Sequence, residues 1–463
     1  MRDSWATLGV DLHLEVTGPG VRRGLTDALR EAVRGGRLAP GTRLPSSRSL
    51  ATDLGVARNT VAGAYADLVA EGWLTARQGS GTRVAEGAAA PRPAEPRTAR
   101  RREPGRPAHN LMPGTPDLSS FPRAEWLKAA RRALNAAPAD ALGYGDPRGR
   151  PELRTALAGY LARARGVRAD PEHIVVCSGF SHGLRLLAEA LRAGGLRDLA
   201  VESYGLAPHW TLLERAGLRT VPLPLDEHGT RVAELPAGGA VLLTPAHQFP
   251  LGGALRAERR AAVVDRARRT GGLVLEDDYD GEFRYDARQP VGALQDLDPD
   301  HVVHLGTASK SLAPGLRLGW LVLPPALTPE ITRLAAARST GVLDQLTLAE
   351  FITSGAYDRH VRACRLRYRR RRDALVEAVA AQSPDVRVTG MAAGLHAVLR
   401  LPPGTEESVV RAAAWQGLAL TGLSWFRHPA ATTEPADAVV VGYGAPSDRA
   451  WPGALEALCR VLP

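Results

Sequence analysis

The pattern of apolar and polar positions begins with a short helical region. Val21–Arg34 places apolar residues at helical spacing, which predicts an amphipathic helix. A second helix is expected over Ser47–Leu54, ending at Gly55, and a third over Arg58–Glu71. Trp73–Val84 is typical of a two-stranded hairpin. Three helices followed by a hairpin predict one compact unit.

A second pattern, in which short apolar runs alternate with helical stretches such as Arg150–Arg165, fills the rest of the chain. This alternation predicts an α/β fold with a mostly parallel sheet covered by helices. The expected strands are His173–Cys177, Ala240–Thr244, Gly272–Glu276 and His301–Leu305.

A segment without apolar periodicity separates the two patterns. Residues 86–109 are rich in Pro, Ala and Arg, which is typical of a flexible basic linker. The 463 residues also exceed what one hydrophobic core usually serves. The sequence therefore predicts a domain over 1–85, a linker over 86–109 and a larger domain over 110–463.

Composition excludes several classes of protein. Hydrophobic residues make up 44% and charged residues 23%, as in ordinary globular proteins, and no apolar run is long enough to span a membrane. Met1–Glu15 carries acidic residues where a signal peptide needs an apolar stretch, so a cytoplasmic protein without a membrane partner is expected. Cys177, Cys364 and Cys459 are widely separated, which favours reduced, buried thiols and no metal site.

Positive charge is concentrated near the start of the chain. Residues 1–110 contain 17 arginines against 11 acidic residues, which is more than half of the net charge of +10. Such a region attracts the phosphates of nucleic acids, although arginine can also serve only to keep a surface solvated.

Lysine is nearly absent. Of 59 basic residues only Lys128 and Lys310 are lysine. Arginine can replace lysine in salt bridges but cannot form an imine, so a remaining lysine is a candidate for amine chemistry. Lys128 lies in a helical stretch and is expected to be an ordinary surface residue.

The N-terminal unit carries polar groups where a helix-turn-helix meets DNA. In a helix-turn-helix the second helix of the motif presents its first residues to base edges. Here that helix is the third of the unit, and its first residues are Arg58, Asn59 and Thr60. The segments Pro40–Arg48, Leu54–Val61 and Glu71–Thr82 resemble the GntR-type winged helix. The resemblance implies double-stranded operator DNA as partner, with phosphate contacts from the loop and second helix, base contacts from the third helix, and a wing tip in or near the minor groove. The implied DNA-binding residues are Arg43, Ser46, Ser47, Arg48, Arg58, Asn59, Thr60, Gly79 and Gly81.

Two segments of the larger domain suit a pyridoxal phosphate site. Gly306–Gly319 places Lys310 beside Ser309 and seven residues before Arg317, so an imine-forming amine lies near groups that can hold a phosphate. A strand upstream ends in acidic residues, where α/β sheets hold ligands. Its Asp277 can pair with a pyridinium nitrogen, and its Tyr279 can donate to a phenolate.

Three further turns can contribute to the same site. Ser178–Leu184 follows a strand and opens a helix, so its amides can hold a phosphate. Thr244–Gly252 supplies His247 and Gln248 near the ring, and Tyr144 in a turn can reach a phosphate.

Together these segments resemble the fold type I aminotransferases, and the order of the two domains resembles the MocR subgroup of GntR regulators. The resemblance implies pyridoxal 5'-phosphate held on Lys310 and a head-to-tail homodimer in which Tyr144 reaches into the partner's site. The other residues expected at the cofactor are Asp277, Tyr279, Ser178, Gly179, Phe180, Ser309, Arg317, His247 and Gln248.

The chain departs from the family pattern at three places. Either Leu206 or Tyr204 must pack on the ring where an aromatic is usual, and Phe180 and Ser181 replace the commoner residues of the phosphate turn. Val440, in an expected C-terminal strand over Ala438–Tyr443, stands where related proteins usually place the arginine that binds a substrate carboxylate. Full transamination of an amino acid then requires Arg427 or another arginine to take over.

The favoured hypothesis is a transcription regulator whose aminotransferase-like domain senses pyridoxal phosphate, a small amine or an amino acid. The alternative is an active aminotransferase with an attached DNA-binding module. A third interpretation is a DNA-binding scaffold without cofactor, which the presence of Lys310 disfavours.

Overall fold

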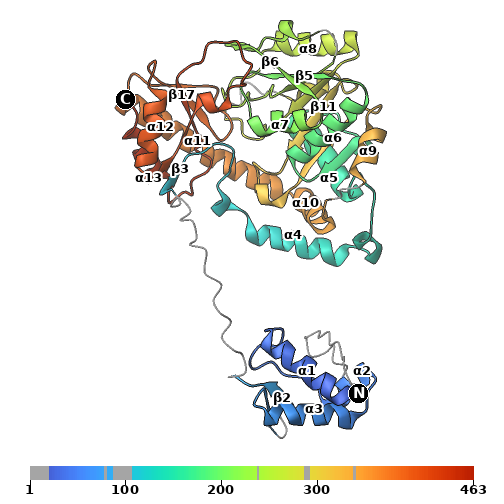
Figure 1. Ribbon diagram of the computed structural model, residues 1–463. Coiled ribbons are helices and arrows are strands. Elements are labelled where there is room, and N and C mark those ends of the chain that lie inside the picture. The colour runs from blue at the N-terminus through green and yellow to red at the C-terminus, as the bar shows by residue number, and fades with distance from the viewer. Residues whose placement is uncertain (1–19, 78–80, 87–106, 237–238, 286–291, 337–339) are drawn as a thin grey trace. The chain divides into compact units, whose positions relative to one another are not determined.

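The computed structural model divides the chain into two compact units, Met1–Arg106 and Pro107–Pro463, each with its own core (Figure 1). It describes residues 20–77, 81–86, 107–236, 239–285, 292–336 and 340–463. Most of the expected linker at 86–109 lies outside the described residues. Within them, no helix has the length and apolar character needed to cross a membrane.

The first unit consists of three helices and a hairpin. The helices are α1 (Val21–Arg34), α2 (Ser47–Leu54) and α3 (Arg58–Ala70), and β1 (Leu74–Arg77) pairs antiparallel with β2 (Gly81–Val84). The predicted bounds of the first two helices are confirmed, and the third ends one residue early. The core of this unit includes Leu25, Leu29, Leu50, Val61, Leu68 and Leu74.

Local chemistry fixes the two helices of the helix-turn-helix. The Ser46 side chain accepts a hydrogen bond from the Ser49 amide at 3.1 Å and caps α2, which ends at Gly55 in the left-handed conformation. The buried Tyr65 hydroxyl of α3 donates to the carbonyl oxygen of Pro45 at 3.0 Å. These bonds hold α3 against the turn that precedes α2.

A seven-stranded sheet forms the centre of the second unit. Its strands follow the order β4-β12-β11-β10-β9-β5-β6, and all neighbours are parallel except at β12, which is antiparallel to both β4 and β11. The mostly parallel sheet predicted from the sequence is therefore confirmed. The strands are β4 (Ile174–Cys177), β5 (Asp198–Glu202), β6 (Arg219–Leu223), β9 (Ala240–Leu243), β10 (Leu273–Asp277), β11 (Val302–Thr307) and β12 (Gly319–Val322).

Helices cover both faces of this sheet because its strands are apolar on both sides. One face packs against α6 (Phe180–Ala193), α7 (Ala207–Arg215) and α9 (Thr328–Ala335). The opposite face is covered by α5 (Pro151–Arg165) and α8 (Ala257–Thr270). Outside α5 lie α4 (Arg123–Ala136) and α10 (Val342–Thr353), which pack on each other.

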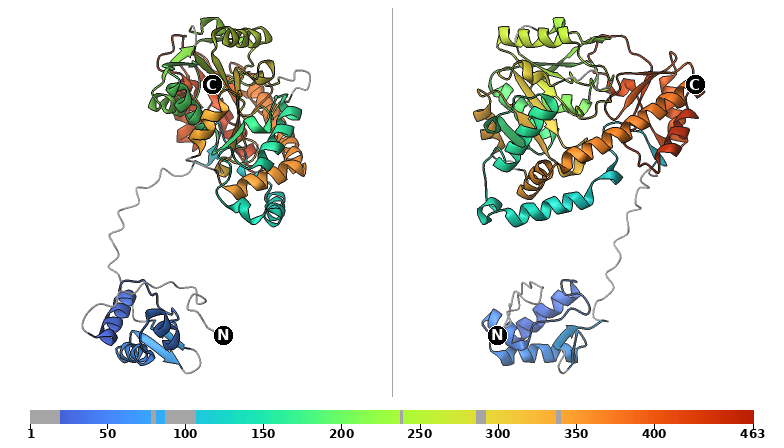
Figure 2. Two further views of the ribbon diagram at one scale, coloured as in Figure 1. Left: turned by 90° about the vertical axis from the view of Figure 1, so that its right-hand side faces the viewer. Right: turned by 180° about the vertical axis from the view of Figure 1, so that it is seen from behind.

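The long helix α11 (Ala356–Gln382) connects the large sheet to a smaller C-terminal layer, as Figure 2 shows in its right-hand view. This layer is a four-stranded antiparallel sheet of order β13-β14-β17-β16, which the sequence analysis did not predict. Its strands are β13 (Arg387–Thr389), β14 (Ala397–Arg400), β16 (Thr421–Gly422) and β17 (Ala438–Val441), and its helices are α12 (Glu406–Trp415) and α13 (Trp451–Cys459). Two further pairs of short strands form separate sheets: β3 (His109–Asn110) with β15 (Leu418–Ala419), and β7 (Leu225–Asp226) with β8 (Gly229–Thr230). All three cysteines are free and buried, as predicted.

Truncating the core of the first unit should destabilise that unit alone. Leu68→Ala removes a fully buried side chain and should lower the unit's free energy of unfolding by about 2–5 kcal/mol. Calorimetry of the full chain should show one transition moving to lower temperature and the other unchanged. The neighbouring Val69→Ala, at a 36% exposed position, serves as the control and should move neither. A common shift of both transitions would contradict two independent cores.

Candidate cofactor site and DNA-binding face

A cavity of about 420 Å³ opens at the carboxyl ends of the central strands. Glu202, Thr244, Asp277 and Thr307 reach it from the ends of β5, β9, β10 and β11. Parallel strands of α/β proteins hold their ligands at this edge, because loops and helix N-termini converge there. The cavity therefore occupies the place where the sequence analysis expects a ligand.

Lys310 lies in the turn between β11 and β12 and lines the cavity. Its Nζ donates to the carbonyl oxygen of Gly114 at 2.6 Å. Burial lowers the pKa of Lys310, and the nearby Asp277 and Asp280 carboxylates act in the opposite direction. A lowered pKa increases the fraction of neutral, nucleophilic amine. Lys128 is exposed on α4, as expected.

Asp277 ends β10 in the same cavity and is buried. Burial raises the pKa of Asp277 well above its usual value, while Lys310 lowers it. Its Oδ1 has no hydrogen-bond partner among the described residues. Since buried polar atoms are almost always paired, this oxygen needs a donor from a bound group. A protonated pyridine nitrogen is such a donor, so the residues present fit pyridoxal phosphate.

Tyr279 also lines the cavity, at the end of a hydrogen-bonded series. Its hydroxyl lies 3.1 Å from Nδ1 of His247, which lies 2.9 Å from Oδ2 of Asp280. His396 lies beside His247 and Asp280, and one potential metal-binding atom from each of the three side chains lies within 4.8 Å of the others. The Nε2 of His396, however, lies 3.0 Å from the carbonyl oxygen of Pro250. Hydrogen bonds therefore account for the cluster.

His247 and Gln248 were expected near the ring, but neither is among the described residues that line the cavity. The Gln248 amide nitrogen donates to the carbonyl oxygens of Tyr204 and Phe249, and its oxygen accepts from the Leu251 amide. Gln248 thus stabilises the turn behind the cavity, and His247 orients Tyr279.

Arg317 lines one end of the cavity, and the glycine turn that precedes α6 lies against its guanidinium. Gly179, with φ of 84°, precedes α6, whose first turn leaves backbone N–H groups without intrahelical partners. The guanidinium of Arg317 lies against Gly179 and has no hydrogen bond or ion pair among the described residues; a Cβ on Gly179 would lie 3.4 Å from its Nη1. Phe180, Ser181 and Ser309 line the cavity beside it. This end can hold a phosphate by amides and charge together.

Ser178 lies just behind this end and is already hydrogen-bonded. Its amide donates to Nδ1 of His182 at 3.0 Å, and its hydroxyl lies 3.4 Å from that of Thr340. Ser178 and Gly179 are not among the described lining residues.

The sequence analysis left Leu206 and Tyr204 as alternatives for the ring face, and both line the cavity. His209, in the first turn of α7, joins them and was not predicted. Its ring lies 4.6 Å from that of Phe180, and burial lowers the pKa of His209 to about 4. The sequence signal for His209 was its spacing from Leu206. The two residues are three apart and belong to one turn, in which the His209 amide donates to the Leu206 carbonyl oxygen.

The C-terminal layer closes the cavity with apolar groups. Val440 is fully buried in β17 and belongs to a cluster with Phe249 and Phe426, two lining residues. Arg427, considered as a replacement for the missing arginine, donates from Nη2 to the carbonyl oxygens of Ala431 and Thr433 at 2.7 Å each. It does not line the cavity.

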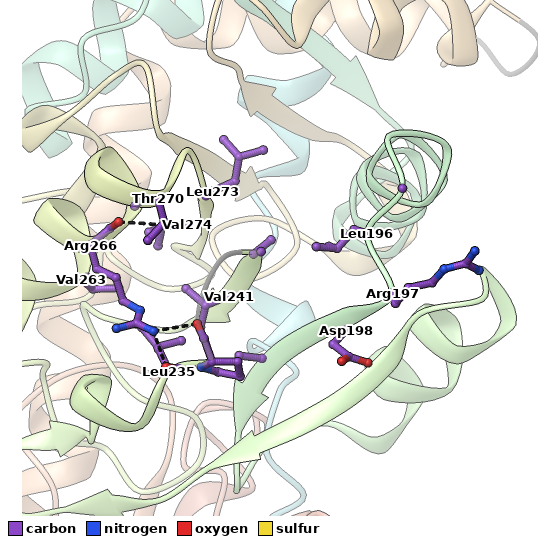
Figure 3. Close-up of a pocket in the computed structure, with 17 residues that line it drawn as sticks. Leu196, Arg197, Asp198, Leu235, Val241, Val263, Arg266, Thr270, Leu273 and Val274 are labelled. Carbon is purple, nitrogen blue, oxygen red and sulfur yellow. Dashed lines mark hydrogen bonds between the residues drawn. The ribbon is translucent and has the colours of Figure 1, made fainter.

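A second hollow lies at the opposite, amino-terminal edge of β5, β9 and β10 (Figure 3). Its Arg266 guanidinium donates to the carbonyl oxygens of Leu235 and Pro236. Asp198, also in its wall, pairs with Arg219. Because these charges already have partners, the hollow has the character of a gap between packed elements.

In the first unit, most of the described residues that are expected at DNA are exposed. Arg58 and Asn59 are exposed and Thr60 is half-buried at the start of α3, and Ser46, Ser47 and Arg48 mark the start of α2. Arg43 lies against the hairpin, where a Cβ on Gly81 would lie 3.2 Å from its Nε. Gly79, expected at the wing tip, lies outside the described residues.

Two family models match this chain. The model for bacterial regulatory proteins of the gntR family matches residues 22–84, and that for aminotransferase class I and II matches residues 110–438. The chain is 34% identical over 452 residues to the probable rhizopine catabolism regulatory protein MocR of Rhizobium meliloti, covering 91% of this chain and 90% of the relative. The chain belongs to the MocR subgroup of GntR-family transcription regulators.

A second relative supports this assignment, and solved structures support the fold of the larger domain. The MocR-type chain is 36% identical over 427 residues to the pyridoxine biosynthesis transcriptional regulator PdxR of Corynebacterium glutamicum, covering 91% of both. Its fold is similar to that of kynurenine aminotransferase of Pyrococcus horikoshii, with a TM-score of 0.68 and 24% identity over 76% of this chain and 90% of that one. An archaeal alanine:glyoxylate aminotransferase matches at the same TM-score and coverage with 23% identity. The protein is thus a DNA-binding regulator with a fold type I aminotransferase-like domain.

Removing one exposed arginine should separate sequence reading from general attraction to DNA. Arg58→Ala should weaken binding to an operator selected from a random DNA pool by roughly 1–3 kcal/mol and reduce the preference over unrelated DNA. Titrations at fixed salt measure both quantities. Arg23→Ala, at an exposed position on α1, is the control and should keep the preference. An unchanged preference in Arg58→Ala would refute the role of α3 in base reading.

Proposed function

We propose that the aminotransferase-like domain binds pyridoxal phosphate through Lys310, and that a small molecule reacting at this site controls DNA binding. The observation that carries the proposal is the unpartnered Oδ1 of buried Asp277 in the cavity that also holds Lys310. When bound, pyridoxal phosphate supplies an aldehyde that condenses with a primary amine. The family membership supports the same cofactor.

Each group at the site has a role set by its surroundings. Asp277 would accept a hydrogen bond from the protonated pyridine nitrogen, Tyr279 would donate to the phenolate, and Arg317 with the α6 N-terminus would neutralise the phosphate. Lys310 provides the amine, whose lowered pKa favours condensation. Gly114 holds this amine by its carbonyl oxygen at the start of the reaction.

Lys310→Ala should abolish covalent attachment of the cofactor. The purified variant, given pyridoxal phosphate and then borohydride, should retain no reduced adduct, whereas the wild type should carry one per chain. Mass spectrometry and the visible absorbance band measure this. Lys128→Ala removes the other lysine and is the matched control, expected to behave as wild type. A wild-type chain that stays colourless and traps nothing would overturn the proposal.

We also propose a homodimer in which Tyr144 reaches into the partner's cofactor site. Tyr144 is fully exposed beyond α4, and Leu127 and Leu134, one heptad apart on α4, are 62% and 50% exposed. Exposed apolar residues in such a row mark an interaction surface. A twofold dimer would also present two DNA-binding units to symmetric half-sites.

Negative charges at Leu127 and Leu134 should therefore weaken the dimer. Leu127→Asp combined with Leu134→Asp should raise the dissociation constant at least about tenfold, because both carboxylates lose water on association. Sedimentation over a range of concentrations measures it. Leu297→Asp, at an equally exposed leucine near β11, is the control. A double variant as dimeric as the wild type would place the interface elsewhere.

A further inference from the structure

The distribution of charge in the cavity limits what the regulator can sense. Among the described lining residues, the only arginine or lysine side chains are Lys310 and Arg317. In the proposed function Lys310 reacts with the cofactor aldehyde, and Arg317 faces its phosphate. The inference below rests on that proposed function, since both cations are then already in use.

The lining histidines add no positive charge. Burial lowers the pKa of His209 to about 4 and that of His396 to about 3, so both rings are neutral at pH 7. Glu202 also reaches the cavity, where its carboxyl group accepts hydrogen bonds from Thr230, Thr244 and Gln248. It offers an acceptor to a ligand, and no cation.

The remaining wall is largely apolar and aromatic. Leu206, Trp210, Phe249, Leu395 and Phe426 line it, and the fully buried Val440 packs behind Phe249 and Phe426. Trp425 lines the cavity while remaining 72% exposed, so it marks the opening to solvent.

Two arginines that are not lining residues donate to backbone carbonyl oxygens. Arg427 donates to Ala431 and Thr433, and Arg284 donates from Nη1 to the Ala246 carbonyl oxygen at 2.9 Å. Neither lines the cavity. A carboxylate packed against this apolar wall would lose its hydration, and no arginine among the described residues of the wall would pair with it.

We propose that this site senses a primary amine without a carboxylate, with an aliphatic or aromatic tail that packs against the apolar wall. Binding exchanges one amine for another at the aldehyde-derived carbon. A C=N bond to the incoming amine forms, the C=N bond to Lys310 Nζ breaks, and the three hydrogens of the incoming ammonium end on Nζ. No oxidant or reductant is required.

Two ligands that differ only in the carboxylate test the proposal. The cofactor-loaded full chain is titrated with 2-phenylethylamine and with phenylalanine, and the shift of the visible absorbance band gives each dissociation constant. The amine is expected to bind at least about tenfold more tightly. The same titrations, repeated with DNA present, report which ligand changes the affinity for the operator.

A substitution directly behind the apolar wall provides a second test of the proposal. Val440→Arg places a guanidinium behind the apolar wall and is expected to reduce or reverse the preference, while Val440→Ile, which adds only a methylene, is expected to keep it. If Val440→Arg fails to fold, the wild-type pair of titrations still decides.

Phenylalanine binding as tightly as the amine in the wild type would overturn the proposal, and so would an absorbance band that neither ligand shifts. A chain without any cofactor band would instead refute the proposed function. The two failures are therefore distinguishable.

Discussion

The buried carboxylate at the end of β10 is the constraint on which the site depends. Asp277 carries an oxygen without a partner in the described part of the chain, in a place where burial penalises its charge. Such an arrangement is costly for a protein by itself, because neither water nor a neighbouring donor satisfies the group. It becomes favourable once a cationic N–H enters the cavity. The nearby amine of Lys310, lowered in pKa by the same burial, shares this dependence.

The sheet fixes the positions of Asp277 and Lys310 relative to each other. Asp277 and Lys310 come from neighbouring strands β10 and β11, whose register places Asp277 opposite Leu305, five residues before Lys310. Because β12 returns antiparallel beside β11, the connection that contains Lys310 is bounded at both ends by buried strands. The phosphate end uses the same geometry, since β4 pairs with β12 and brings the α6 N-terminus to Arg317.

The sequence predicted what local chemistry determines. Lys310 stood out because arginine replaces lysine almost everywhere else, and the helix bounds of the first unit followed from caps and turns. The groups that were missed come together only through the fold: Gly114, His209 and His396 are far apart in sequence and share one cavity. The C-terminal sheet was missed because β16 has two residues and β13 three, too few to show an alternating pattern.

A regulator also needs a difference between its liganded and unliganded states, since a ligand that binds both equally shifts nothing. In the proposed function, the hydrogen bond between Lys310 Nζ and the Gly114 carbonyl would differ between these states, because amine exchange would alter the bonding and charge of Nζ. Gly114 follows β3 (His109–Asn110), where the second unit begins, and Met112, Pro113 and Thr115 line the cavity around it. Chemistry at Lys310 would therefore act first on the segment of the second unit that is nearest in sequence to the DNA-binding unit.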